Sequence, residues 1–213
     1  MEQNVQDVLE LQAQRAIKAL EKNQINGYYV KTKEDVVAKV QEILQEGDSV
    51  AVGGSRTLFE TGLIDHLRSG RYEFFDRHAP GLNHDQIDEI HRKAFSADGY
   101  LCSCNALTLN GEIYNVDGNG NRVAAMAFGP KKVIVVAGIN KLVRNLEEAQ
   151  ERVRMIAAPA NARRFPGEMT CLNFGQCANC HDKGRICCSF LTTAFQRNPQ
   201  RMHVILVGEE LGY

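Results

Sequence analysis

The chain has 213 residues, enough for one substantial α/β domain or two very small ones. Its 25 Lys and Arg residues against 26 Asp and Glu give a formal net charge of −1, without the basic excess of a general nucleic-acid binder. The hydrophobic content of 44% excludes intrinsic disorder as the main state. No apolar run approaches the roughly 18 residues of a membrane span, and the first residues do not form a secretory signal. We therefore expect a cytoplasmic protein.

Regular spacing of apolar residues predicts the elements in the first part of the chain. Residues 3–23 have the period of an amphipathic helix, which we expect to pack on the core or to form the seam of a homodimer. A short strand at 28–30 precedes a second helix that ends at Gly47. The strand at 49–52 then leads through two glycines into a helix that ends near residue 68.

Strands and helices continue to alternate along the chain. The pattern predicts strands at 73–75, 100–104, 113–116, 133–136 and 203–207, and helices at 84–97, 121–128 and 146–157. The alternation from residue 27 to residue 157 indicates a parallel sheet covered by helices on both faces. The β-branched run at 133–136 is typical of a strand inside such a sheet. We expect a single three-layer α/β domain over residues 1–213.

Residues 159–200 depart from this alternation, because their periodicity is weak and long loops of this kind tend to be functional or disordered. The loop holds five of the seven cysteines: Cys171, Cys177, Cys180, Cys187 and Cys188. The spacing Cys177-x2-Cys180 is used by zinc and iron–sulfur sites, and Cys171 and Cys187 bring the number of thiolates to four. These four residues are candidate ligands of a zinc ion or of an iron–sulfur cluster. The alternative is a set of reduced thiols without metal.

A glycine pair after the strand at 49–52 predicts an anion site. Gly53, Gly54 and Ser55 lie between that strand and the next helix. Glycines let the backbone approach a ligand closely, and free N–H groups at a helix start attract phosphate or carboxylate. The spacing fits neither a Walker loop nor a dinucleotide fingerprint. A tight turn without a ligand remains the alternative.

A polar loop after the strand at 113–116 is a second candidate site. Asp117 is a candidate general base, Arg122 a candidate anion clamp and Asn121 an amide donor. Gly118 and Gly120 lie between them and allow close backbone approach. The alternative is an Asx-turn that caps the following helix.

Two further segments complete the predicted site. Asn140 and Lys141 directly follow the buried strand at 133–136, where ligands of parallel sheets bind, and Lys141 could contact an anionic substrate. Asn105 begins the polar segment 105–108. For Lys141, a solvated position in a loop is the alternative.

With these residues identified, the chain resembles the lactate-utilisation (LUD) domain family over nearly its whole length. The segments that carry the resemblance are 104–108, 115–125, 129–133, 138–141 and 157–162, together with the cysteine loop and the closing residues 209–213. The resemblance implies a fold similar to the sugar-phosphate isomerase and CoA-transferase superfamily. It also implies a part in bacterial oxidation of L-lactate to pyruvate, alongside iron–sulfur partner proteins. It supplies no catalytic residues, so the candidate residues above rest on their chemistry.

Two functions follow from these observations. In the first, the protein is an accessory protein or subunit in the oxidation of L-lactate or a related 2-hydroxy acid. In the second, it is a stand-alone isomerase or acyl/CoA transferase that acts on a small phosphorylated or carboxylated substrate. Both need a small anionic substrate, and neither needs nucleic acid or a membrane span.

Overall fold

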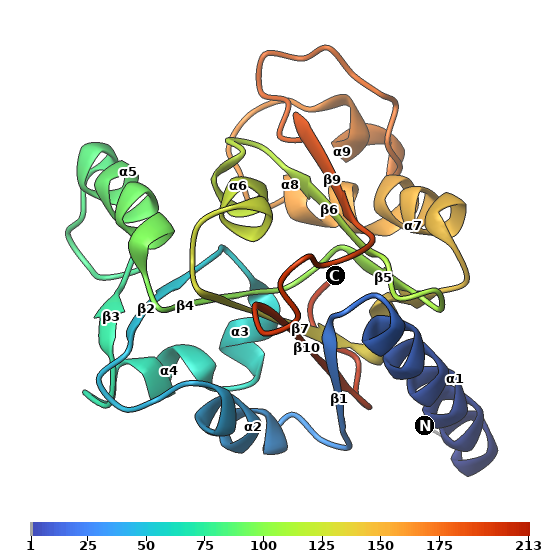
Figure 1. Cartoon of the computed structure of the whole chain (residues 1–213). Coiled ribbons are helices and arrows are strands. Elements are labelled where there is room, and N and C mark those ends of the chain that lie inside the picture. Colours follow the sequence, from blue (N-terminus) through green and yellow to red (C-terminus); the bar gives the residue numbers. More distant parts are fainter. Residues whose placement is uncertain (1) are drawn as a thin grey trace.

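The computed structural model describes residues 2–213, and its centre is a six-stranded parallel sheet. The strand order is β1-β10-β7-β4-β2-β3, and every neighbouring pair is parallel. The strands are β1 (Asn26–Val30), β2 (Ser49–Val52), β3 (Glu73–Phe75), β4 (Gly99–Cys102), β7 (Lys132–Gly138) and β10 (Met202–Val207). Figure 1 shows this sheet between helices, so the predicted α/β fold is confirmed.

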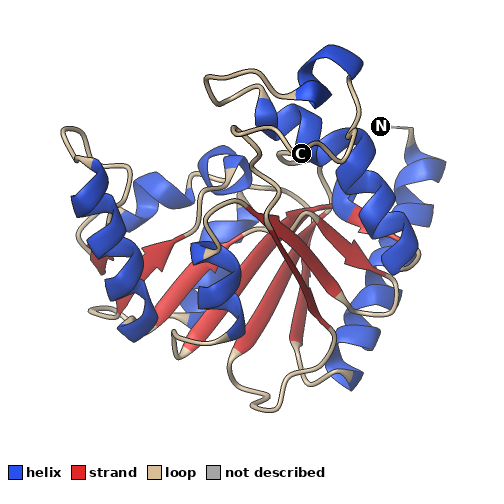
Figure 2. Cartoon of the chain, turned by 90° about the horizontal axis from the view of Figure 1, so that it is seen from above, coloured by secondary structure: helices blue, strands red, loops and turns tan. Residues whose placement is uncertain are grey.

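Alternate residues of the central strands pack into two separate cores, one on each face of the sheet. Val133 and Val135 of β7 belong to one core, and Ile134 and Val136 belong to the other. Residues of α1 (Gln3–Lys22) and α6 (Asn121–Ala127) complete the first core; residues of α2 (Asp35–Ile43), α3 (Arg56–Glu60) and α4 (Leu63–Leu67) complete the second. Each fully buried aliphatic side chain contributes about 1.5–3 kcal/mol. Figure 2 shows the resulting layers, with helices on both sides of the strands.

A second, four-stranded sheet lies beside the first. Its order is β8 (Leu142–Val143), β5 (Ala106–Thr108), β6 (Ile113–Asp117) and β9 (Ser189–Thr193). The prediction that the alternation up to residue 157 forms a parallel sheet is wrong for the strand at 113–116. The chain reverses at Gly111, whose φ of 78° a glycine adopts readily, so β6 pairs with β5 in the antiparallel sense.

Three predicted helices and the predicted loop also need correction. The predicted helix ending near residue 68 is divided into α3 and α4 at Gly62, whose φ is 70°. The predicted helix at 146–157 is α7 (Leu146–Arg152), continued by a π-helical turn and by α8 (Ala158–Ala162). The loop predicted over 159–200 contains α9 (Thr170–Phe174) and β9, which were too short to recognise from periodicity. The helix predicted at 84–97 is α5 (His84–Lys93) with a 3-10 turn after it.

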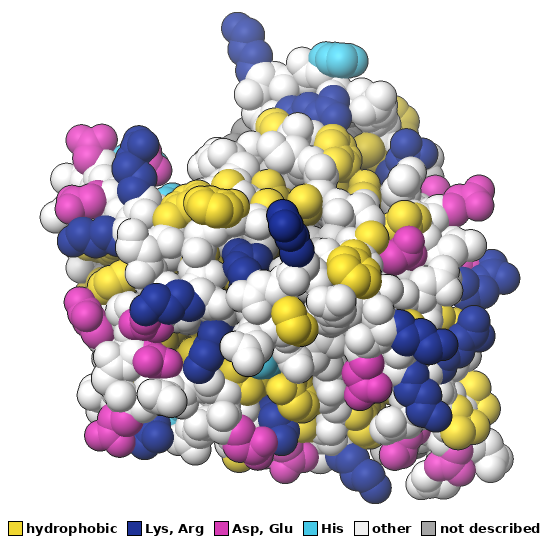
Figure 3. Space-filling model, viewed as in Figure 1, with side chains coloured by type: hydrophobic (Ala, Val, Ile, Leu, Met, Phe, Trp, Pro, Cys, Tyr) yellow, Lys and Arg dark blue, Asp and Glu magenta, His cyan; other side chains and the backbone are white. Residues whose placement is uncertain are grey.

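The surface mixes both signs of charge. Figure 3 shows both basic and acidic side chains distributed over the face seen in Figure 1. Among residues 2–213, no helix has the length and apolar character required to cross a membrane.

Candidate functional site

A cavity of about 470 Å³ opens where the parallel strands end. Residues that follow the ends of five strands of the parallel sheet, β2, β3, β4, β7 and β10, line this cavity. In strand order along the chain these wall residues are Gly54, Ser55 and Thr57, then Arg77, then Ser103 and Cys104, then Lys141, and finally Gly212 and Tyr213. This convergence arises because the carboxyl ends of parallel strands meet at one edge of the sheet.

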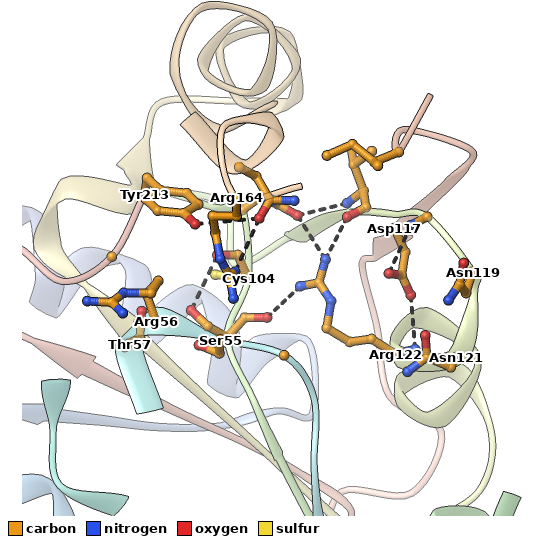
Figure 4. Close-up of a pocket in the computed structure, with 18 of the residues that line it drawn as sticks. Ser55, Arg56, Thr57, Cys104, Asp117, Asn119, Asn121, Arg122, Arg164 and Tyr213 are labelled. Carbon is orange, nitrogen blue, oxygen red and sulfur yellow. Dashed lines mark hydrogen bonds between the residues drawn. The ribbon is translucent and has the colours of Figure 1, made fainter. Parts of the chain in front are cut away.

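The opposite wall and the roof come from the second sheet and the segments around it. The wall contains Asn105, Val116, Asp117, Gly118, Asn119, Asn121 and Arg122, and the roof contains Asn161, Arg164, Phe165 and Ile186. In Figure 4, Asp117, Asn119, Asn121 and Arg122 stand on one side of the close-up, while Arg56, Thr57 and Tyr213 stand on the other. The structure therefore brings three separately predicted segments together around one cavity.

Eight of the predicted binding and catalytic residues line this cavity: Gly54, Ser55, Asn105, Asp117, Gly118, Asn121, Arg122 and Lys141. Gly53, Gly120 and Asn140 are not in its wall. A Cβ atom on Gly53 would lie 3.0 Å from the Tyr100 hydroxyl oxygen and 3.1 Å from Cδ of Arg122, so this glycine makes room for Arg122. The Asn140 side chain bonds the backbone of Leu211 and Gly212 and so holds the last residues against the cavity.

Lys141 is a buried cation at the base of the cavity. Lys141 is only 2% exposed. Its Nζ atom donates hydrogen bonds to the hydroxyl oxygens of Thr57 and Ser103, each at 2.9 Å. Burial lowers the pKa of Lys141 from its ordinary 10.5 to about 8, with a smaller opposite effect from Cys104 and a further lowering from Arg152. At neutral pH this amine can therefore attract an anion and can also exchange its proton.

Arg122 lies in the wall, but its guanidinium is already engaged by the protein. Nη1 donates to the carbonyl oxygen of Ser103 at 2.9 Å and to Oδ1 of Asn115 at 2.7 Å. Nη2 donates to the carbonyl oxygen of Val116 at 2.6 Å and to Oδ1 of Asn105 at 3.2 Å. These bonds pin the end of β4 to β6, so Arg122 supplies positive charge to the cavity while its terminal donors face protein acceptors.

Asp117 makes the contacts of a helix cap. Oδ2 accepts the backbone N–H groups of Arg122 at 2.9 Å and Val123 at 3.2 Å, in the first turn of α6. Oδ1 accepts the N–H of Gly118 at 3.0 Å. A carboxylate at the start of a helix is favoured by the helix dipole. The contacts of Asp117 are therefore those expected if it caps α6, and its role as a general base stays a prediction.

Arg77 is the main candidate that the sequence analysis missed. Its Nε is buried without a hydrogen-bond partner, and within residues 2–213 no carboxylate lies at salt-bridge distance from its guanidinium. Burial lowers the pKa of Arg77, Tyr100 and Asp117 raise it in part, and Arg164 lowers it slightly, although the group stays charged at any ordinary pH. Arg77 follows β3 by two residues, so the strand-end rule applied to Gly53 and Lys141 would also have found it.

The cavity as a whole is strongly cationic. Its wall holds Arg56, Arg77, Arg122, Arg164 and Lys141 against the single carboxylate of Asp117. Only Arg56 of these cations forms an ion pair within residues 2–213, a 3.9 Å contact with Glu60. Positive charge that is partly removed from water without a counter-ion costs free energy, and an anionic ligand would offset that cost.

The four predicted cysteine ligands line a second, much smaller cavity of about 20 Å³ under the same roof. Burial and, to a smaller extent, the neighbouring thiol of Cys177 raise the pKa of Cys187 to about 11. All seven cysteines are free, and Cys102 and Cys104 are buried as expected. Within residues 2–213, no three His, Cys, Asp or Glu side chains stand at the mutual distances of a formed metal site.

These features define an α/β domain with a cationic cavity at the ends of its parallel strands. The family model of the LUD domain matches residues 13–207, so the chain belongs to the LUD domain family, which is linked to lactate utilisation. The chain is also similar to the crystal structure of a DUF162 family protein from Deinococcus radiodurans, with a TM-score of 0.51 and 17% sequence identity. That alignment covers 95% of this chain and 98% of the other, and it shows a shared fold. No curated protein matches the sequence.

Proposed function

We propose that this protein binds a small organic acid in the cationic cavity and serves as an accessory protein or subunit in the oxidation of L-lactate or a related 2-hydroxy acid. The observation that carries the proposal is a pair of cations in the cavity wall, Arg77 after β3 and Lys141 after β7, neither of which forms an ion pair within residues 2–213. An anionic ligand in the cavity would offset part of the cost of removing these charges from water. The family's link to lactate utilisation supports the same class of ligand.

The chemistry of the wall suits a 2-hydroxy acid or the matching 2-oxo acid. Guanidinium groups bind carboxylates in a forked geometry, and Arg77 has a donor without a partner. The hydroxyl groups of Ser55 and Ser103 and the amide of Asn121 are neutral groups of the wall that can bond the ligand's hydroxyl or carbonyl oxygen. In this proposal the electrons of the oxidation pass to an iron–sulfur partner protein.

Calorimetric titration tests the binding step directly. L-lactate and pyruvate are expected to bind, and the neutral analogue lactamide is not. Arg77→Gln is expected to weaken lactate or pyruvate binding by about tenfold or more, because a hydrogen bond to a charged group contributes about 1.5–3 kcal/mol. Arg92→Gln is the matched control, since Arg92 is exposed on α5 and lies outside the cavity wall. Equal binding by both variants would contradict the assignment of the cavity.

A stand-alone isomerase or transferase is the second candidate. The observation in its favour is Lys141, whose pKa of about 8 suits general acid–base chemistry and whose Nζ lies 2.9 Å from the Ser103 hydroxyl oxygen. The cavity volume of about 470 Å³ also falls in the range of sites for larger ligands such as sugar phosphates.

Proton exchange separates the two candidates. Purified protein is incubated in D2O with a sugar phosphate or with L-lactate, and exchange of the substrate's C–H proton is followed by NMR. Exchange that disappears in Lys141→Met would favour the stand-alone enzyme. Lactate or pyruvate binding without any exchange favours the accessory role.

A further inference from the structure

Four cysteines that are spread over 17 residues of chain come together around one small cavity in the roof. Cys171 lies in the first turn of α9, Cys177 and Cys180 lie in the turn that follows, and Cys187 precedes β9. All four line the cavity of about 20 Å³, whereas Cys188 is exposed and lies outside its wall. Four cysteines therefore line one cavity, and the fifth lies outside it.

Residues around the cavity hold the backbone that carries these thiols. The Asp182 carboxylate accepts both the N–H and the hydroxyl of Thr170 at 2.8 Å, which fixes the start of α9 beside Cys171. Arg185 donates to the carbonyl oxygens of Cys180 and, at 2.8 Å, Cys187.

The turn between Cys177 and Cys180 has a further feature of a thiolate site. The backbone N–H of Asn179 points at Sγ of Cys177, with an N···S distance of 3.3 Å. Asn179 adopts a φ of 47°, an unusual conformation for a residue other than glycine. An N–H group directed at sulfur stabilises the charged thiolate and orients it, as the groups around metal ligands do.

The space enclosed by the four cysteines matches a single ion. Its volume of about 20 Å³ is roughly that of one water-sized body. Four thiolates around one ion are the ligand set of tetrahedral structural zinc. We propose that Cys171, Cys177, Cys180 and Cys187 bind one zinc ion. The sulfurs close on the ion by turning inward around the cavity they line, and each thiol that binds releases its proton to solvent.

The zinc site would also fix the roof of the anion cavity. Ile186 lines both cavities, and the N–H of Cys188 donates to the carbonyl oxygen of Asp117 at 2.9 Å. Residues directly beside the proposed ligand Cys187 therefore contact the wall of the larger cavity. This coupling, unlike the zinc site itself, rests on the proposed function.

Metal analysis of the purified full chain tests the zinc site. The expected result is one zinc per chain in the native protein and in Cys188→Ser, and loss of zinc in Cys177→Ser and Cys180→Ser. Cys188→Ser is a matched control because it removes a thiol next to a proposed ligand but outside the cavity. Iron with inorganic sulfide, no bound metal, or equal loss of zinc in Cys188→Ser would each overturn the proposal.

Cobalt(II) titration of the native protein keeps the test independent of whether the serine variants fold. We expect one equivalent of cobalt to bind and to show the strong thiolate-to-cobalt absorption of a tetrahedral sulfur site. A spectrum typical of octahedral oxygen coordination would overturn the proposal. The metal content is measured without any organic acid, so a failure of lactate or pyruvate to bind would count against the proposed function and leave the zinc result standing. Lower lactate affinity after zinc removal would support the coupling.

Discussion

The burial of Lys141 predicts a specific dependence of stability on pH. Its pKa falls from 10.5 in the unfolded chain to about 8 in the folded protein, mainly because burial disfavours the charged amine. Between these two values the unfolded state binds more protons than the folded state, so the free energy of unfolding rises with pH. The gain from Lys141 amounts to about 2–3 kcal/mol between about pH 7 and about pH 10.

The comparison with Lys141→Met isolates this contribution. Methionine fills much of the same volume but loses the two hydrogen bonds to Thr57 and Ser103, which are worth about 1 kcal/mol each. We expect the variant to be as stable as the native protein or more stable near neutral pH, and less stable near pH 10. Urea unfolding of both proteins across this range measures the difference, in which other titrating groups cancel. A difference that stays constant with pH would refute the reasoning.

Three further predictions concern the surroundings of the cavity. Binding of L-lactate or pyruvate should take up protons and weaken as the pH rises through about 8, because an anion favours the charged form of Lys141; titration in buffers of different ionisation enthalpy measures the uptake. Gly138→Ala should cost about 1–3 kcal/mol, because its Cβ would lie 2.4 Å from the backbone nitrogen of Leu211, whereas Gly184→Ala meets nothing closer than 3.8 Å and should be near neutral in thermal unfolding. If Asp117 is a cap, Asp117→Asn should change stability little and Asp117→Ala should cost about 1 kcal/mol, whereas equal losses in urea unfolding would contradict the cap.

The parallel sheet could be predicted because its strands are marked by local signals. The run at 133–136 is apolar on both faces, and the structure buries its residues in two separate cores. The strand at 49–52 and its glycine pair were equally clear. Of the second sheet, only the strand at 113–116 had a local signal; β5 has three residues, β8 has two, and the pairing of all four strands depends on contacts distant in sequence.

The candidate site was predictable to the extent that it follows strand ends. Ser55 and Lys141 come from that rule, and both line the cavity. Arg77 also follows a predicted strand, the one at 73–75, but no motif surrounds it, so it was not singled out although the same rule applies to it. The engagement of Arg122 with four oxygen atoms could not be predicted either, because the acceptors come from β6 and from the segment between β4 and β5.

Arg77 and Lys141 are expected to lower the stability of the protein without ligand and to raise its stability when an anionic ligand is bound. This pair of opposite effects distinguishes a binding role from a structural role. A cation that is removed from water, wholly for Lys141 and partly for Arg77, and that forms no ion pair within residues 2–213 lowers the stability of the empty protein. Its neutral replacement should therefore leave basal stability equal or higher. A ligand at 100 times its dissociation constant adds about 2.7 kcal/mol to the free energy of unfolding, and the replacement should remove most of that gain. A structural cation would instead show lower basal stability and an unchanged response to L-lactate or pyruvate. The two measurements therefore distinguish the roles even if the chemistry that follows binding takes place on a partner protein.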